Sequence, residues 1–261
     1  MNNLILRQIG RIKMALKNDI SLGQHWLKNR EILDYIAECA GSGGVCVEIG
    51  PGLGTLTSSL LRRFEKVIAV EYDKELARKL PGSFPGTNLE VVNADFLECD
   101  LGAMLGPYVV AGNIPYYITT PILLKLVYEE NRPERIVLLM QKEVVERIVD
   151  PRGSVLALTI KNRADVEAGM VVKAEEFTPP PKVDSQVLIL KPHPPIVSEA
   201  VIDFIKVGFS QPRKKVTRNL SVLMPREDIK DIFIKMNMNI DVRPHELSLQ
   251  DWEKIYQKMH K

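Results

Sequence analysis

Between residues 45 and 191, short runs of β-branched and apolar residues alternate with longer amphipathic stretches. Such runs predict strands, here at Val45–Ile49, Lys66–Val70, Leu89–Val92, Tyr108–Ala111, Arg135–Met140, Leu156–Ile160 and Val187–Leu190. Apolar residues at helical spacing predict helices at Asn29–Ala40, Leu56–Phe64, Lys74–Leu80 and Pro121–Glu129. Because this alternation is typical of βαβ units, we expect an α/β fold with a mainly parallel sheet of seven strands.

A proline-rich segment over residues 191–195 interrupts this pattern and is typical of a linker. Beyond it the spacing is helical only, which predicts helices at Ser198–Phe209, Lys214–Leu223, Arg226–Met236 and Leu249–Met259. We therefore expect two domains. Residues 1–190 would form an α/β domain with a basic N-terminal arm, and residues 191–261 a small helical domain.

The composition is that of an ordinary globular protein, with 45% hydrophobic and 26% charged residues among 261. The three cysteines, Cys39, Cys46 and Cys99, have no CxxC spacing, which favours a reducing compartment over a disulfide framework. The four histidines are too dispersed to predict a metal site, and no apolar run reaches the roughly 20 residues that cross a bilayer. We expect a cytoplasmic protein with no metal and no membrane segment.

Positive charge is concentrated in two segments, although the net charge is only +2. Such clusters are the electrostatic footprint of phosphate binding, but a solvated face is the more frequent explanation. The first cluster also has apolar residues at helical spacing, as in an organellar transit peptide, although no serine precedes Ser21. If RNA is the partner, the expected contacts are Arg7, Arg11, Lys13, Lys17, Arg213, Lys214, Lys215 and Arg218.

A glycine-rich segment lies directly after the first predicted strand, with Gly50, Gly52 and Gly54 in a GxGxG spacing. Glycines between a strand and a helix permit a tight turn and a close approach of the backbone to a ligand. A dinucleotide-binding loop has the longer spacing GxGxxG. The shorter loop resembles the S-adenosylmethionine loop of Rossmann-like methyltransferases, in which no pyrophosphate has to be bound. A glycine-rich turn without a ligand is the alternative.

Acidic residues follow the next two predicted strands. Glu71 lies about twenty residues beyond the glycines and can accept hydrogen bonds from both ribose hydroxyls. Its neighbour Tyr72 is expected to contact the cofactor as well. Asp95 can accept from the adenine amine of the cofactor, while Phe96 can cover the ring. Asp95 could instead cap the next helix, but together with the glycines and Glu71 it favours ligand binding.

The segment Asn113–Tyr117 follows the fourth predicted strand and carries candidate catalytic groups. The exocyclic amine of adenine is a poor nucleophile because its lone pair is delocalised into the ring. Acceptors such as the Asn113 side-chain oxygen and the Ile114 carbonyl can take its hydrogens and free that lone pair. Pro115 fixes the direction of the backbone, and Tyr116 offers a face for stacking. The alternative is a loop turn with incidental aromatic residues.

Over nearly its whole length, the chain resembles the ribosomal RNA adenine N6-dimethyltransferases of the KsgA type. Besides the segments above, the resemblance rests on residues 21–27, 141–147, 177–185, 211–220 and 243–248. It implies a Rossmann-like class I methyltransferase sheet that binds S-adenosyl-L-methionine. It also implies that Tyr116 and Phe177 sandwich the target adenine. The implied cofactor contacts include Gln24, His25, Leu27, Gly50, Glu71, Asp95 and Asn113.

Two positions depart from the family pattern. Trp26 stands where the family motif usually has Phe, and residues 151–158 replace an expected Tyr-Gly-Arg-Leu-Ser-Val run. The second departure bears on how the substrate is recognised more than on the type of reaction.

The resemblance implies two methyl transfers to N6 of adenines in small-subunit ribosomal RNA, with a role in small-subunit biogenesis, by a monomer. One alternative is an Erm-type methyltransferase of large-subunit RNA, which shares the Asn-Ile-Pro-Tyr loop. A second is a protein glutamine N5-methyltransferase, because an amide nitrogen poses the same lone-pair problem. A third is an RNA-binding assembly factor without catalysis. The segments at 178–185 and 243–248 favour the small-subunit enzyme.

Overall fold

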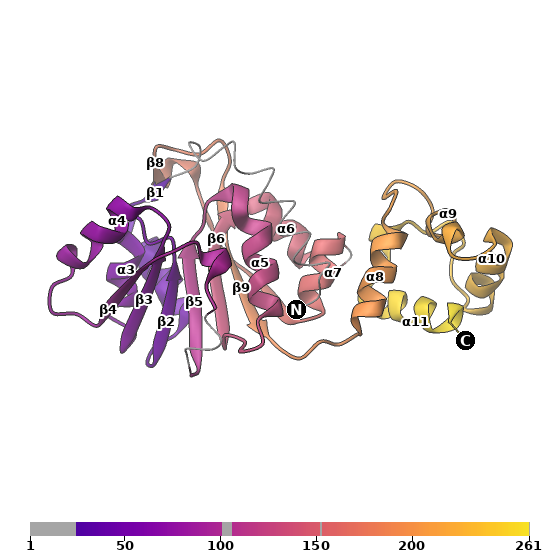
Figure 1. Ribbon diagram of the computed structural model, residues 1–261. Helices are drawn as coiled ribbons and strands as arrows, with labels where there is room; N and C mark the ends of the chain where they lie inside the picture. Colours follow the sequence, from indigo (N-terminus) through magenta and orange to yellow (C-terminus); the bar gives the residue numbers. More distant parts are fainter. Residues whose placement is uncertain (1–24, 101–105, 152, 261) are drawn as a thin grey trace. The chain divides into compact units, whose positions relative to one another are not determined.

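The computed structural model describes residues 25–100, 106–151 and 153–260 (Figure 1). The predicted RNA contacts at Arg7, Arg11, Lys13 and Lys17 and the predicted cofactor contact at Gln24 lie outside the described residues. Within them the chain forms two compact units. The first contains residues up to 145 together with 165–193, and the second contains residues 146–164 together with those from 194 onward.

The first unit is built on a seven-stranded sheet with the order β4-β3-β2-β5-β6-β9-β7. Its strands are β2 (Val45–Ile49), β3 (Lys66–Glu71), β4 (Leu89–Asn93), β5 (Tyr108–Asn113), β6 (Arg135–Gln141), β7 (Ala164–Val172) and β9 (Ser185–Pro192). The pairs from β4 through β6 are parallel, and β9 lies antiparallel to β6. The expected seven-stranded, mainly parallel Rossmann-like sheet is therefore confirmed.

Helices that lie before, between and after the parallel strands cover the sheet (Figure 1). They are α2 (Arg30–Ala40), α3 (Thr55–Leu60), α4 (Lys74–Lys79), α5 (Thr119–Tyr128) and α6 (Lys142–Val149). Side-chain caps begin two of them: Asn29 Oδ1 accepts from the amide nitrogens at the start of α2, and Asp73 Oδ1 does the same for α4. Short 3₁₀ turns lie at Leu80–Ser83, Phe96–Glu98, Tyr116–Ile118 and Ala174–Glu176.

The core of this unit lies on both faces of the sheet. Successive side chains of a strand point to opposite faces, so Cys46 and Ala111 pack with Ile36 of α2 and Leu60 of α3. The alternate strand residues point to the other face, where α5 lies (Figure 1), and they are buried as well. Burial on both faces explains why these strands are nearly continuous apolar runs.

One predicted strand is wrong: Leu156–Ile160 lies within helix α7 (Val155–Lys161). Ser154 caps this helix by accepting from the amide nitrogen of Ala157 at 3.3 Å. Leu158 is buried among the apolar side chains of the second unit. A short apolar run fits a buried helix as well as a strand, and the cap and the packing decide for the helix. The remaining strand of the sheet is β7, whose alternating pattern was not recognised as a strand.

The second unit is helical and has a core of its own. Its helices beyond the linker are α8 (Glu199–Gly208), α9 (Val216–Asn219), α10 (Arg226–Lys235) and α11 (Leu249–Met259). They pack around the buried Trp252. The Phe204 ring lies edge-on to it, with the ring centroids 5.9 Å apart, and Phe233 is also fully buried. The predicted helix Lys214–Leu223 is shorter than expected, because α9 passes into a 3₁₀ turn at Leu220–Val222.

Residues before the linker also belong to the second unit. The buried side chain of Asn162, just after α7, accepts from Val197 N at 2.7 Å and donates to Val197 O at 3.1 Å. These bonds tie α7 to the chain that leads into α8. The assignment of methyl transfer to residues 1–190 and RNA binding to 191–261 stays a prediction.

Candidate active site at the carboxyl ends of the central strands

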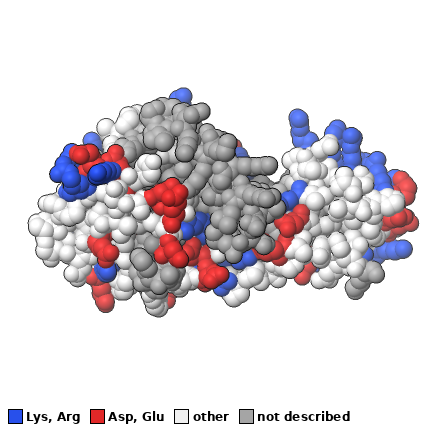
Figure 2. All heavy atoms as spheres, viewed as in Figure 1, with Lys and Arg blue, Asp and Glu red and all other residues white. Residues whose placement is uncertain are grey.

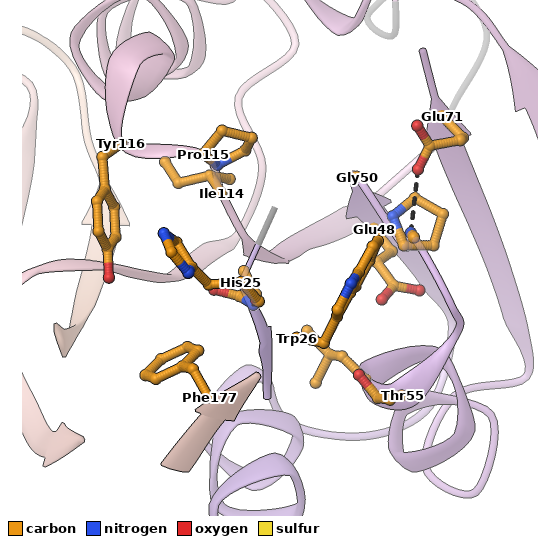
Figure 3. Close-up of a pocket in the computed structure, with 14 residues that line it drawn as sticks. His25, Trp26, Glu48, Gly50, Thr55, Glu71, Ile114, Pro115, Tyr116 and Phe177 are labelled. Carbon is orange, nitrogen blue, oxygen red and sulfur yellow. Dashed lines mark hydrogen bonds between the residues drawn. The ribbon is translucent and has the colours of Figure 1, made fainter. Parts of the chain in front are cut away.

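A pocket lies at the carboxyl ends of β2, β3 and β5 (Figure 3). The chain leaves β2 toward β3 on one side, and β5 pairs with β2 on the other side. In open α/β sheets such a switch point is the usual position of ligand sites. The pocket is lined by His25, Trp26, Glu48, Gly50, Pro51, Gly52, Thr55, Leu56, Glu71, Asn113, Ile114, Pro115, Tyr116 and Phe177.

The glycine loop is held by the carboxylate at the end of β3. Glu71 Oε2 accepts from Gly52 N at 3.0 Å, and Oε1 accepts from Asp73 N at 2.8 Å. Glu71 is only 5% exposed, so these bonds replace water around the carboxylate. A carboxylate has about four acceptor positions, and the two backbone bonds leave positions for the hydroxyls of a ribose.

Asn113 reaches the pocket because β5 approaches β2 closely. A Cβ atom on Gly112 would lie 2.9 Å from the carbonyl oxygen of Ile49, so this approach requires glycine. The backbone then leaves the sheet, with Ile114 N donating to Leu139 O at 3.2 Å. The Asn113 amide is oriented by its nitrogen, since Nδ2 donates to the His25 carbonyl at 3.2 Å. This bond leaves Oδ1 as the acceptor that a substrate amine can use.

Two aromatic residues far apart in sequence meet in the pocket. Strand β1 (Trp26–Leu27) pairs antiparallel with β8 (Phe177–Thr178), and this pairing brings Phe177 beside the N-terminal segment. Tyr116 forms a hydrogen bond to the Ser185 hydroxyl at 2.7 Å, and burial raises the pKa of its phenol. The structure thus brings both predicted stacking residues to one pocket, with Phe177 only 3% exposed.

The imidazole of His25 lies beside the Tyr116 ring. The ring centroids are 6.0 Å apart and the planes differ by 29°. The Nδ1–H of His25 donates to the Pro179 carbonyl at 2.7 Å. His25 therefore contributes its ring to the aromatic side of the pocket and its backbone carbonyl to the orientation of Asn113.

Several predicted cofactor residues do not line the described pocket. Leu27 has a fully buried side chain in the core, and a Cβ on Gly54 would meet Leu80 and Phe84. Asp95 caps the next 3₁₀ turn, because its Oδ1 accepts from Leu97 N at 2.9 Å. That geometry is the capping alternative that the sequence left open, and the cofactor contact of Asp95 stays a prediction.

Tyr72 and Phe96 lie outside the pocket lining as well. Tyr72 is 66% exposed, whereas Phe96 is buried with the Lys125 ammonium 5.9 Å from its ring centroid. Burial raises the pKa of Tyr117, and the nearby Tyr72, Asp95 and Glu71 raise it further. Tyr117 therefore lies near Tyr72, Asp95 and Glu71, of which Glu71 lines the pocket.

A buried acid lines the pocket without a role expected from the sequence. Glu48 is 1% exposed and accepts from the Thr57 hydroxyl at 2.6 Å. Burial raises its pKa to about 8, against the lowering effect of the Thr57 bond, and the neighbouring Glu71 raises it further. A glutamate inside an otherwise apolar buried strand was the signal that could have identified it. Trp26, Thr55 and Leu56 also line the pocket without having been predicted.

The predicted RNA contacts of the helical unit are exposed. Arg213, Lys214 and Lys215 precede α9, and Arg218 lies within it. Figure 2 shows Lys and Arg atoms gathered on one side of this unit. Lys215 forms an ion pair with Asp241 at 2.5 Å, so part of its charge is compensated within the protein.

Neither a metal cluster nor a membrane span stands out in the part of the chain that the structure describes. No group of three or more His, Cys, Asp or Glu side chains is arranged there to hold a metal ion. Among the described helices, none combines the length and the apolar character needed to cross a membrane.

Comparisons with known proteins identify the family of the chain. The profile of the family described as ribosomal RNA adenine dimethylase matches residues 15–258. The chain is 36% identical over 256 residues to ribosomal RNA small subunit methyltransferase A of Acaryochloris marina, covering 91% of this chain and 95% of that protein. It is 35% identical over 255 residues to the protein of the same name from Geobacter sulfurreducens, covering 90% and 92%.

Solved structures show the same fold. The 23S rRNA methyltransferase ErmE superposes with a TM-score of 0.75 at 25% identity, covering 90% of this chain and 100% of that one. A dimethyladenosine transferase from Plasmodium falciparum gives 0.74 at 26% identity, covering 90% and 98%. The profile and the relatives each extend over most of the sequence, and on these grounds the chain belongs to the ribosomal RNA adenine dimethylase family.

Proposed function

We propose that this protein transfers methyl groups from S-adenosyl-L-methionine to N6 of adenines in small-subunit ribosomal RNA, giving N6,N6-dimethyladenosine during small-subunit biogenesis. The observation that carries the proposal is the Asn113 amide, whose nitrogen is bound by the His25 carbonyl in a pocket that also contains Glu71 and the glycine loop. The names of relatives at 35–36% identity support the substrate.

The donor groups of the pocket fit S-adenosyl-L-methionine. Glu71 keeps acceptor positions for the ribose hydroxyls, and the glycine loop presents backbone to the ligand. His25 lies across the pocket from the loop (Figure 3). When bound, the cofactor supplies an electrophilic methyl group on a sulfonium. The proposed contacts outside the pocket lining, Leu27, Gly54, Tyr72, Asp95 and Phe96, belong to the same proposal.

The protein's own reactive groups are two hydrogen-bond acceptors for the target amine. Asn113 Oδ1 and the Ile114 carbonyl accept hydrogens from N6, so the nitrogen becomes more tetrahedral and its lone pair is freed. Pro115 holds the direction of the backbone that carries this carbonyl. After a transfer the nitrogen is more acidic, and its proton leaves to water. The monomethylated amine keeps one hydrogen, which Asn113 or Ile114 can still accept in the second transfer.

The target adenine has to leave its stack to reach the pocket. Tyr116 and Phe177 are the proposed stacking partners of the base. Because Phe177 is 3% exposed and His25 lies beside Tyr116, entry of a base requires the side chains here to move apart. Arg213, Lys214, Lys215 and Arg218 would bind phosphates and position the RNA, while the pocket selects the base. We propose that the protein acts as a cytoplasmic monomer.

Methylation of large-subunit RNA is the second candidate, because the ErmE structure superposes as well as the dimethyladenosine transferase does. The sequence relatives decide between them: proteins named for the small subunit are 35–36% identical, whereas ErmE is 25% identical.

Incubation with radiolabelled cofactor tests the proposal. The substrates are small subunits that lack adenine dimethylation, with large subunits and peptide release factors in parallel, and the labelled RNA is digested to nucleosides. Labelled dimethyladenosine from the small subunit is the expected result. Label on the large subunit would assign the Erm-type activity, and label on protein would overturn the RNA substrate.

A further inference from the structure

Trp26 lines the pocket, and its side chain has no part in the proposed function. Strand β1 places it next to His25, and its indole lies against the glycine loop (Figure 3). A Cβ atom on Gly52 would lie 2.2 Å from Cζ3 of this indole. Side chains do not approach so closely, so the absence of a side chain at Gly52 is what admits the ring. The indole is thereby held on the loop that approaches the cofactor.

The acidic groups that line the pocket around Trp26 do not oppose a cation. Glu48 and Glu71 line the pocket, and within the described residues no Lys or Arg lines it. Both carboxyl groups are nearly fully buried and are engaged by the Thr57 hydroxyl and by backbone amides. A ligand with a positive charge therefore meets no Lys or Arg among the described lining residues, and the aromatic wall remains to contact it.

Donor and product differ in charge as well as in the methyl group. The sulfonium of S-adenosylmethionine is positively charged, whereas the thioether of S-adenosylhomocysteine is neutral. A cation over an aromatic face is attracted by the quadrupole of the ring, and Trp gives the strongest such contact. Two successive transfers require the product to leave and a second donor to bind, so a preference for the charged form favours this exchange.

We propose that the Trp26 indole binds the sulfonium of the methyl donor and thereby distinguishes it from the neutral product. The proposal rests on the proposed function, since it takes S-adenosylmethionine as the cofactor. Trp26 is then a residue that determines ligand preference, and Gly52 is the position that seats it.

Binding of donor and product to the full chain tests this without turnover. Dissociation constants of S-adenosylmethionine and S-adenosylhomocysteine are measured by calorimetry for the wild type, Trp26→Phe and Trp26→Leu. Trp26→Leu is expected to weaken donor binding about 2-fold to 30-fold more than product binding, the range of one cation–π contact. Trp26→Phe is expected to give a smaller change in the same direction, because Phe keeps an aromatic face.

Phe177→Leu is the matched control, since it removes another aromatic ring from the same pocket and should leave the donor-to-product ratio unchanged. Equal weakening of both ligands by Trp26→Leu would overturn the proposal and leave Trp26 as an apolar wall. A ratio change in Phe177→Leu as large as that in Trp26→Leu would overturn the assignment to Trp26. If Trp26→Leu does not fold, the ratio in Trp26→Phe decides. Failure of the wild type to bind either ligand would instead contradict the proposed function.

Discussion

The side-chain nitrogen of Asn113 donates to the main-chain carbonyl of His25 at 3.2 Å, across 88 positions of sequence. An amide bound in this way presents its oxygen to the pocket, and that orientation is the one needed to accept a hydrogen from an amine. The backbone carbonyl is held in turn by the neighbouring pairing of β1 with β8. His25 and Trp26 therefore line the pocket, and His25 also orients the Asn113 amide directly.

The hydrogen bond between His25 and Pro179 leads to a prediction about cofactor affinity. The His25 imidazole donates to the Pro179 carbonyl, in the segment that follows Phe177. We expect His25→Ala to remove this contact and to weaken donor binding by about 2-fold to 13-fold, because a typical hydrogen bond contributes roughly 0.5–1.5 kcal/mol. Calorimetry with S-adenosylmethionine measures this. Unchanged affinity in His25→Ala would show that the imidazole is not part of the cofactor site.

Glu48 predicts an unusual dependence of stability on pH. Its pKa in the folded protein, about 8, is above the ordinary value of 4.5. The unfolded chain therefore releases this proton first, and Glu48 lowers the stability of the fold as pH rises from about 4.5 to 8. Glu48→Gln keeps an acceptor for Thr57 and does not titrate. We expect the variant to match the wild type near pH 4.5 and to exceed it near pH 8 by on the order of a few kcal/mol.

Urea unfolding at several pH values measures this difference. Thr57→Val is a useful companion variant, because it removes the hydroxyl that donates to Glu48 at 2.6 Å. A gap between wild type and Glu48→Gln that is constant with pH would contradict the prediction.

Substitution of Gly112 is expected to lower both the stability and the activity of the protein. Alanine there would place Cβ 2.9 Å from the Ile49 carbonyl oxygen, so β5 has to move away from β2. We expect Gly112→Ala to lower the free energy of unfolding by about 1–3 kcal/mol and to displace the adjacent Asn113. Gly106→Ala is the matched control, since a Cβ there meets nothing within 4 Å. Equal effects of the two substitutions would contradict a close approach of β5 to β2.

Removal of basic residues from the helical unit is expected to change how RNA affinity depends on salt. Arg213, Lys214 and Arg218 are exposed, whereas Lys215 is paired with Asp241. Replacing the first three by Ala is expected to reduce the slope of log affinity against log salt by roughly 2–3, and to leave cofactor binding unchanged. Filter binding of small-subunit RNA over a salt series measures the slope. Arg78→Ala, on α4, serves as the control, and an equal loss in that variant would argue for unspecific charge effects.

The parallel part of the fold could be predicted because each strand from β2 to β6 is a short apolar run bounded by turns. The same reasoning predicts that Glu71 and Asn113 meet at one edge of the sheet, because they end parallel strands, and both line the pocket. It failed at α7, where the decisive contacts are the Ser154 cap and the burial of Leu158 in the second unit. An apolar run of five residues is too short for its spacing to distinguish a helix from a strand.

The site itself was predictable where a motif is local and not where it depends on packing. Phe177 and Tyr116 were assigned to one site by resemblance, and the β1–β8 pairing is the physical reason that Phe177 reaches it. Glu48 and Trp26 became pocket residues only through burial and through the contact with Gly52. Neither feature leaves a periodic signal in sequence.

The most direct test of the account is a single-turnover reaction of Asn113→Ala with small subunits that lack adenine dimethylation, beside a measurement of its affinity for S-adenosylmethionine. Asn113→Asp is the companion variant, because it keeps an acceptor oxygen but cannot donate to the His25 carbonyl. We predict that transfer to adenine falls by more than about 100-fold in Asn113→Ala, while cofactor binding is weakened but detectable. Transfer at the wild-type rate in Asn113→Ala would contradict the central role of this amide.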